Sequence, residues 1–132
     1  MRPRPHPSPI SEQFWAATAE STLLLQRCQP CGTANFYPRV NCIACGAQEL
    51  HWEEASGRGT LHTFTIARRA THPAFEGEGP YAVAIVALEE GPHMTTNLVD
   101  CDLDALRIDQ AVELVWDEAG EDGYRLPLFR PV

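Results

Sequence analysis

The chain lacks several features that would place it in familiar classes of protein. It has no lysine, so its ten basic residues are all Arg, and its net charge is −8. No apolar run approaches the roughly 20 residues that a helix needs to cross a bilayer. Residues 1–9 are rich in Pro and Arg and lack the apolar stretch of a secretory signal. We therefore expect no membrane contact and a cytoplasmic location.

Acidic residues are concentrated in the second half of the chain. Residues 1–72 contain seven Arg against five acidic residues, whereas residues 73–132 contain three Arg against thirteen acidic residues. An acidic half repels the phosphate backbone of nucleic acids. A nucleic-acid partner is therefore not expected. The five histidines occur singly along the chain, and no pairing of a nucleophile with a base is evident from the sequence.

Four of the five cysteines form two closely spaced pairs. Two residues separate Cys28 from Cys31 and Cys42 from Cys45, and ten residues separate the pairs. Two intervening residues let one tight turn direct both sulfurs at the same ion. A glycine follows each pair, and glycine accepts the positive φ that such a turn requires. The spacing predicts one closed, four-thiolate, structural metal site, with zinc as the expected ion.

Other uses of these cysteines are less consistent with the sequence. A disulfide framework favours an oxidising compartment and an even number of cysteines. A thioredoxin-like redox pair needs a βαβ unit, and no helical period follows the first pair. An iron centre uses the same four thiols, so the spacing alone leaves zinc versus iron open. The fifth cysteine, Cys101, has no matching partner, and we interpret it as a residue near a strand end.

The periodicity of the sequence predicts a mainly β protein. Residues 1–10 are expected to be a flexible tail. Residues 11–49 are expected to contain a short helix, capped by Ser8 or Ser11 and ending near Glu20, followed by a rubredoxin-like zinc ribbon. Residues 50–132 are expected to form a five- to six-stranded OB-fold barrel. Its strands are expected at 50–54, 59–68, 81–88, 93–99, 111–117 and 124–129, with one helical turn near 103–107.

The order of these features resembles the bacterial and archaeal zinc-ribbon OB-fold proteins, a former domain of unknown function. The resemblance extends from about Phe14 to the C-terminus. Its motifs are Phe14-Trp15, Leu25-Gln26-Arg27-Cys28, Phe36-Tyr37-Pro38-Arg39, the two Cys-x-x-Cys-Gly pairs, Gly57-Arg58-Gly59-Thr60, Pro80-Tyr81, Gly91-Pro92, Thr96-Asn97-Leu98-Val99-Asp100 and Leu126-Pro127. Two residues depart from the family pattern. Asp109 stands where Gly is usual, in a turn that Asp can still accept, and Leu128 replaces an often polar residue.

The resemblance implies a non-catalytic accessory subunit of a thiolase-superfamily enzyme that acts on acyl-CoA thioesters. Partners in the family include thiolases and lipid-transfer-type aldolases that shorten steroid side chains by retro-aldol cleavage. The small subunit is expected to stabilise its partner, to be encoded near it, and to help wall the CoA-thioester channel. The alternatives are a single-stranded nucleic-acid-binding OB-fold module and a stand-alone acyl-CoA-binding protein.

Five further residues are candidates for contacts outside the metal site. Arg68 and Arg69, at the end of a strand, could contact CoA phosphates or simply be solvated. Phe14 and Trp15 could seal the underside of the barrel or anchor a partner, and we favour the anchor. Phe75, in the Gly- and Pro-rich loop 71–80, is expected either to order against a partner or to lie in an ordinary loop.

Overall fold

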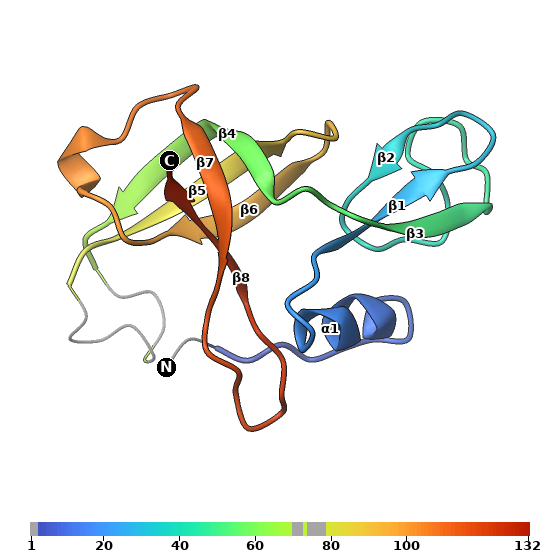
Figure 1. Ribbon diagram of the computed structural model, residues 1–132, viewed down its shortest axis with the longest axis horizontal. Helices are drawn as coiled ribbons and strands as arrows, with labels where there is room; N and C mark the ends of the chain where they lie inside the picture. Colours follow the sequence, from blue (N-terminus) through green and yellow to red (C-terminus); the bar gives the residue numbers. More distant parts are fainter. Residues whose placement is uncertain (1–2, 70–72, 74–78) are drawn as a thin grey trace.

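The computed structural model describes residues 3–69, 73 and 79–132. It contains one short helix, a three-stranded sheet and a closed five-stranded barrel. Figure 1 shows the three-stranded sheet beside the barrel, with the helix beneath both. The expected class, mainly β with an N-terminal helix, a zinc ribbon and an OB-like barrel, is confirmed.

Helix α1 spans Glu12–Thr18 and is shorter than expected. The turn that follows the helix includes Ser21, which has a φ of 57°. The side chain of Thr18 is fully buried, where its hydroxyl donates to the carbonyl of Trp15 at 2.6 Å and accepts the N–H of Arg125 at 3.2 Å. These bonds join the helix to the segment before the last strand. In the part of the chain that the structure describes, no helix has the length and apolarity to span a membrane.

The three-stranded sheet has the order β2-β1-β3, with β1 at Leu24–Cys28, β2 at Ala34–Asn35 and β3 at Leu50–Glu54. Residues 50–54, which the sequence pattern places in the barrel domain, all pair with β1 in antiparallel register. The cause is the second cysteine pair: it turns the chain back, so that Leu50 lies opposite Cys28. The strand therefore completes the ribbon sheet.

The barrel has the order β4-β5-β6-β8-β7. Its strands are β4 at Arg58–Ala67, β5 at Tyr81–Leu88, β6 at His93–Leu98, β7 at Ala111–Trp116 and β8 at Pro127–Pro131. A 3-10 turn, η2, covers Leu103–Ala105. The last strand begins three residues later than expected. Asp109 has a φ of 68°, so the turn before β7 keeps the left-handed geometry with Asp in place of Gly.

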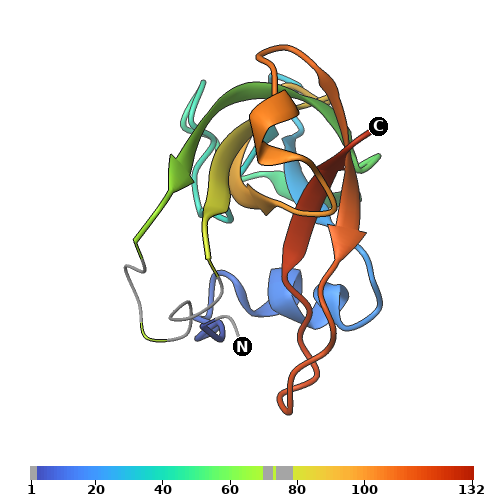
Figure 2. The ribbon, with the colours of Figure 1, turned by 90° about the vertical axis from the view of Figure 1, so that its left-hand side faces the viewer.

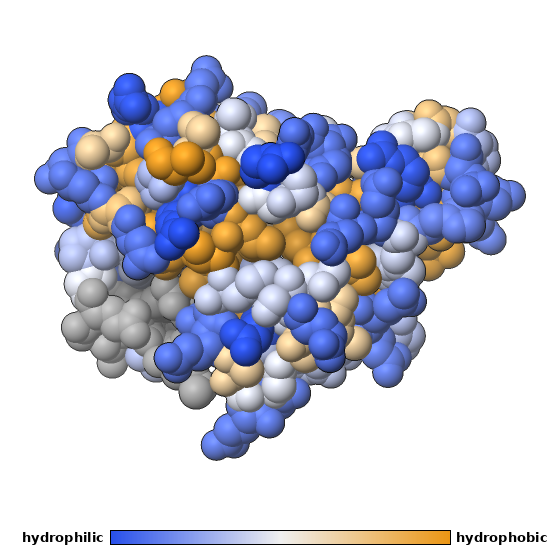
Figure 3. All heavy atoms as spheres, viewed as in Figure 1, coloured by the Kyte–Doolittle hydropathy of each residue, from blue (hydrophilic) through white to orange (hydrophobic). Residues whose placement is uncertain are grey.

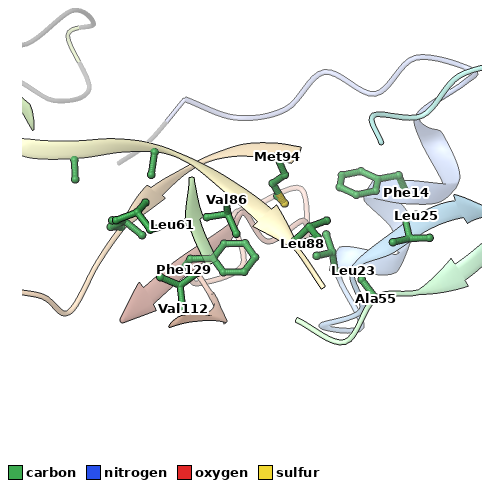
Figure 4. Packing of buried hydrophobic residues seen from close by; sticks show 13 residues of the cluster. Phe14, Leu23, Leu25, Ala55, Leu61, Val86, Leu88, Met94, Val112 and Phe129 are labelled. Atoms are coloured by element: carbon green, nitrogen blue, oxygen red, sulfur yellow. The ribbon is translucent and has the colours of Figure 1, made fainter. Parts of the chain in front are cut away.

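One hydrophobic core continues from the ribbon into the barrel. Figure 4 shows Phe14, Leu23, Leu25 and Ala55 at the ribbon end, followed by Leu88 and Met94, and then Leu61, Val86, Val112 and Phe129 inside the barrel. In Figure 2, the view from the barrel side, α1 lies below the barrel and the loop between β7 and β8 extends past it. Because the core is shared, the ribbon and the barrel are held in a defined relation.

Candidate metal centre and interdomain groove

The two cysteine pairs lie at matching turns. Cys28 ends β1, and the N–H of Gly32 donates to its carbonyl at 2.9 Å. The second turn repeats the bond, from the N–H of Gly46 to the carbonyl of Cys42, also at 2.9 Å. Both glycines have positive φ, 76° and 80°. Each turn therefore has the geometry that the two-residue spacing predicts.

The turns bring all four sulfurs together. The ligand atoms of Cys28, Cys31, Cys42 and Cys45 all lie within 4.8 Å of one another. The sulfurs of Cys28 and Cys45 are 3.5 Å apart, and those of Cys31 and Cys42 are 3.6 Å apart. A tetrahedral zinc site with Zn–S bonds of about 2.3 Å has sulfurs about 3.8 Å apart, and a disulfide bond is about 2.05 Å long. The four cysteines are free and are positioned to bind one metal ion.

Hydrogen bonds to the sulfurs favour thiolates at part of the cluster. The N–H of Cys45, followed by the Asn35 amide at 3.5 Å, lowers the pKa of Cys42 to about 6. The Thr33 hydroxyl, 3.2 Å from the sulfur of Cys31, lowers the pKa of that thiol. The N–H of Cys31 acts in the same direction on Cys28, but burial and the neighbouring thiols outweigh it and raise the pKa of Cys28 to about 12. A divalent cation would stabilise all four thiolates together.

Asn35 holds the two cysteine turns in place through hydrogen bonds, a role that we did not predict. Its side chain is buried and lies on β2, between the two turns. Besides the bond to Cys42, its amide donates to the carbonyl of Thr33 at 3.1 Å and its oxygen accepts the N–H of Ile43 at 2.9 Å. One side chain therefore ties the first turn to the second. The signal in the sequence was an amide residue midway between the cysteine pairs.

Cys101 lies apart from this cluster. Burial, followed by the charges of Asp100 and Asp102, raises the pKa of its thiol. A raised pKa keeps the thiol protonated and weakly nucleophilic. The environment therefore fits a structural cysteine.

An apolar groove of about 220 Å³ lies between the ribbon side of the molecule and the barrel. It is lined by Phe14, Trp15, Phe36, Tyr37, Met94, the segment 95–97 and the segment 126–128. Strands β6 and β8 pair only at Leu98 and Phe129, and the groove lies beside the earlier residues of both strands. The Tyr37 hydroxyl accepts the N–H of Thr95 on β6 at 2.8 Å. The ribbon and the barrel therefore share this groove.

The predicted contact residues have different surroundings. Phe14 is only 4% exposed and packs edge-on against Trp15 and Phe36, with ring centroids 5.0 and 5.6 Å apart. The buried ring of Phe14 therefore offers a partner little surface, so the partner anchor that we favour for this pair would have to rely on Trp15. Trp15 keeps part of its surface at the groove and lies 6.3 Å from the ring of Tyr124.

The remaining candidates lie at or near the loop after β4. Arg68 and Arg69 are exposed just beyond the end of β4. Phe75 lies outside the described residues.

Leu128, the residue that departs from the family pattern, is buried and lines the groove. Sequence reasoning missed the groove, because its walls come from four segments far apart in the chain.

A closed four-thiolate ribbon joined to an OB-like barrel defines a zinc-ribbon OB-fold protein. Residues 15–51 match the model of the ChsH2 rubredoxin-like zinc ribbon domain, and residues 52–117 match that of the ChsH2 C-terminal OB-fold domain. The chain belongs to this ChsH2/DUF35 family. The match to the zinc ribbon domain and the arrangement of the four cysteines support a structural zinc.

Curated relatives carry the same sequence pattern. A probable enoyl-CoA hydratase alpha subunit of Thermomonospora curvata is 37% identical over 99% of this chain, which spans 40% of that protein's length. A DUF35 domain-containing scaffold protein of Methanothermobacter thermautotrophicus is 39% identical over 74% of this chain and 75% of its own length. The corresponding scaffold protein of Pyrococcus furiosus is 32% identical over 91% of both chains.

Two solved structures share the fold. A chain of the Ltp2-ChsH2(DUF35) aldolase superposes with a TM-score of 0.85 at 37% identity, covering 97% of this chain and 98% of that one. A DUF35-family protein of unknown function from Sulfolobus solfataricus superposes with a TM-score of 0.67 at 13% identity, covering 95% of this chain and 87% of that one. The second likeness concerns the fold alone.

Proposed function

We propose that this chain is a non-catalytic accessory subunit of a thiolase-like enzyme that acts on acyl-CoA thioesters. The observation that carries the proposal is the match, over nearly the full length of both chains, to a component of the Ltp2-ChsH2(DUF35) aldolase. Two relatives are named as a subunit and as a scaffold protein, which points in the same direction. We further propose a partner of the thiolase or lipid-transfer-type aldolase kind, in steroid or lipid side-chain degradation, and a cytoplasmic location.

The metal centre supports a non-catalytic role. Four thiolates fill a tetrahedral coordination shell, so no position remains for water or substrate. When bound, zinc would hold the two turns together and supply no reaction chemistry. The raised pKa of Cys101 also makes that thiol a poor nucleophile. The reacting groups would then come from the partner.

The groove and the arginines support a contribution to the substrate channel. The groove is apolar and is lined in part by Trp15 and Tyr37, as a wall for an acyl or pantetheine chain would need to be. Arg68 and Arg69 are exposed and suited to CoA phosphates. The proposed channel would thus combine an apolar wall from this chain with the partner's catalytic surface.

The test is co-expression with a thiolase-superfamily protein from the same genome, which we expect to be encoded nearby, followed by copurification and analytical ultracentrifugation. We expect a stable complex in which this chain carries one zinc. Loss of acyl-CoA affinity on changing Arg68 and Arg69 to Ala, with complex formation intact, would support the phosphate contacts. Absence of a complex, with the isolated chain binding acyl-CoA or a single-stranded oligonucleotide at micromolar levels, would favour one of the alternative functions.

A further inference from the structure

Three neighbouring barrel strands carry no Asp, Glu or Arg apart from Arg58, the first residue of β4. The residues concerned are 59–67 on β4, 81–88 on β5 and 93–98 on β6. The chain as a whole is 21% charged and has a net charge of −8. Charged residues resume just beyond the strand ends, at Arg68, Glu89 and Asp100. The strands pair side by side, β4 with β5 and β5 with β6, so the uncharged segments form one continuous surface.

The outward side of this surface is unusually apolar for a barrel exterior. On β5 the buried residues Ala82, Ala84, Val86 and Leu88 alternate with partly exposed ones, so the outward positions are Tyr81, Val83, Ile85 and Ala87. A solvated strand normally carries polar residues at its outward positions. Here β5 is apolar on both sides, and its outward side therefore has the composition of a surface that becomes covered.

The strands on both sides extend this patch. In the sheet register, Ile85 lies between Thr63 on β4 and Thr95 on β6, and Val83 lies between Thr65 and Asn97. We call these six residues the β4–β5–β6 face. A shallow groove of about 240 Å³ lies over most of it, and Thr95 also lines the groove beside Trp15 and Tyr37. Apolar centres flanked by hydroxyls and aromatic residues, with charges only at the rim, are typical of protein interfaces.

The opposite side of the barrel has a different character. On β7 and β8, Glu113 accepts a hydrogen bond from Arg130 at 2.8 Å. Figure 3, seen as in Figure 1, shows hydrophilic residues interrupting the hydrophobic area over the barrel. The depletion of charge is therefore a property of the β4–β5–β6 face rather than of the barrel exterior in general.

We propose that the β4–β5–β6 face is the surface on which this chain binds its thiolase-like partner, an inference that rests on the proposed function. The partner's matching surface must be uncharged and apolar at its centre, because a charge placed against Val83 and Ile85 would lose its water without gaining a counterion. A second copy of this chain is disfavoured as occupant, since each copy carries a net charge of −8. The docking site for the partner therefore lies on the barrel. The groove beside Trp15 and Tyr37 adjoins this interface at Thr95.

The experiment compares two matched Ile→Arg changes. Ile85→Arg places a cation at the centre of the face, whereas Ile108→Arg makes the same change at a residue that is 54% exposed between η2 and β7. Thr63→Arg adds a third variant at an exposed position of the face, where a charge is compatible with folding. Zinc content and thermal unfolding are measured first, and the dissociation constant for the co-expressed partner is then measured by calorimetry.

We expect Ile85→Arg and Thr63→Arg to weaken binding by roughly a hundredfold or more, with Ile108→Arg within about threefold of the unchanged chain. Binding by both face variants at the original affinity would overturn this inference and leave the proposed function intact. Failure of the unchanged chain to bind the partner would overturn both. Self-association of the unchanged chain that Ile85→Arg abolishes, with partner binding retained, would assign the face to a second copy and overturn the inference.

Discussion

The change Cys28→Ser tests the role of the metal centre. Cys28 is 1% exposed and ends the central strand of the ribbon sheet. Serine is close to cysteine in size but is a poor zinc ligand, so the change removes one of four ligands with little change in packing. Cys101→Ser makes the same substitution outside the cluster and serves as the matched control.

The structure indicates how much order depends on the metal. Among residues 29–49, all of which the structure describes, only Asn35 and Cys42 are buried, so this segment has no hydrophobic core of its own. Structural zinc contributes about 10–16 kcal/mol of apparent binding free energy at pH 7. Without it, the hydrogen bonds of the two turns cannot hold the segment.

We expect Cys28→Ser to lose its zinc, measured by elemental mass spectrometry, and to lose amide hydrogen-exchange protection across residues 29–49. Complex formation with the partner should fall with folded protein, because Tyr37 and Phe36 of this segment line the shared groove. Cys101→Ser should keep its metal and its protection. Full zinc content and unchanged protection in Cys28→Ser would refute the reasoning, and iron in place of zinc in the unchanged chain would correct the identity of the ion.

Two further predictions concern contacts between the N-terminal region and the barrel. Thr18→Val keeps the shape of the buried side chain but removes the acceptor of the partly buried Arg125 N–H, so the free energy of unfolding in urea should fall by about 1–3 kcal/mol. A loss below about 0.5 kcal/mol would contradict this. The hydrogen bond from Arg4 lowers the pKa of Asp122, so carboxyl NMR should find its titration below the ordinary value of about 3.9. The stability that this pair contributes is fully present above the ordinary pKa and is lost as the pH falls through the lowered pKa of Asp122. Arg4→Ala should return the pKa of Asp122 toward its ordinary value. If Asp122 titrates in this variant as it does in the unchanged chain, the contact is refuted.

Local signals were sufficient for the metal centre and for most of the barrel. The spacing of the cysteines and their glycines predicts the turns, because both depend on residues a few positions apart. The apolar run at 81–88 predicts β5 with the bounds observed, including its apolar outward side. The turn at Asp109 was predictable for the same reason, because the left-handed φ of Asp109 depends only on the residues of that turn.

Features that depend on distant residues could not be predicted in the same way. The pairing of β3 with β1 joins residues about 26 apart in the chain, and the local pattern at 50–54 fits either sheet. The burial of Phe14 results from its contacts with Phe36 and the core. The hydrogen bond between Tyr37 and Thr95 spans 58 positions. These long-range contacts create the groove, and no short motif encodes them.

The central claim is that this chain acts through a partner enzyme rather than by itself. The most direct measurement is the steady-state turnover of an acyl-CoA substrate by the thiolase-like partner alone, by this chain alone, and by the reconstituted complex. We predict no turnover by this chain, low activity or instability of the isolated partner, and full activity of the complex. Turnover by this chain alone, or a partner equally active and stable without it, would contradict the account.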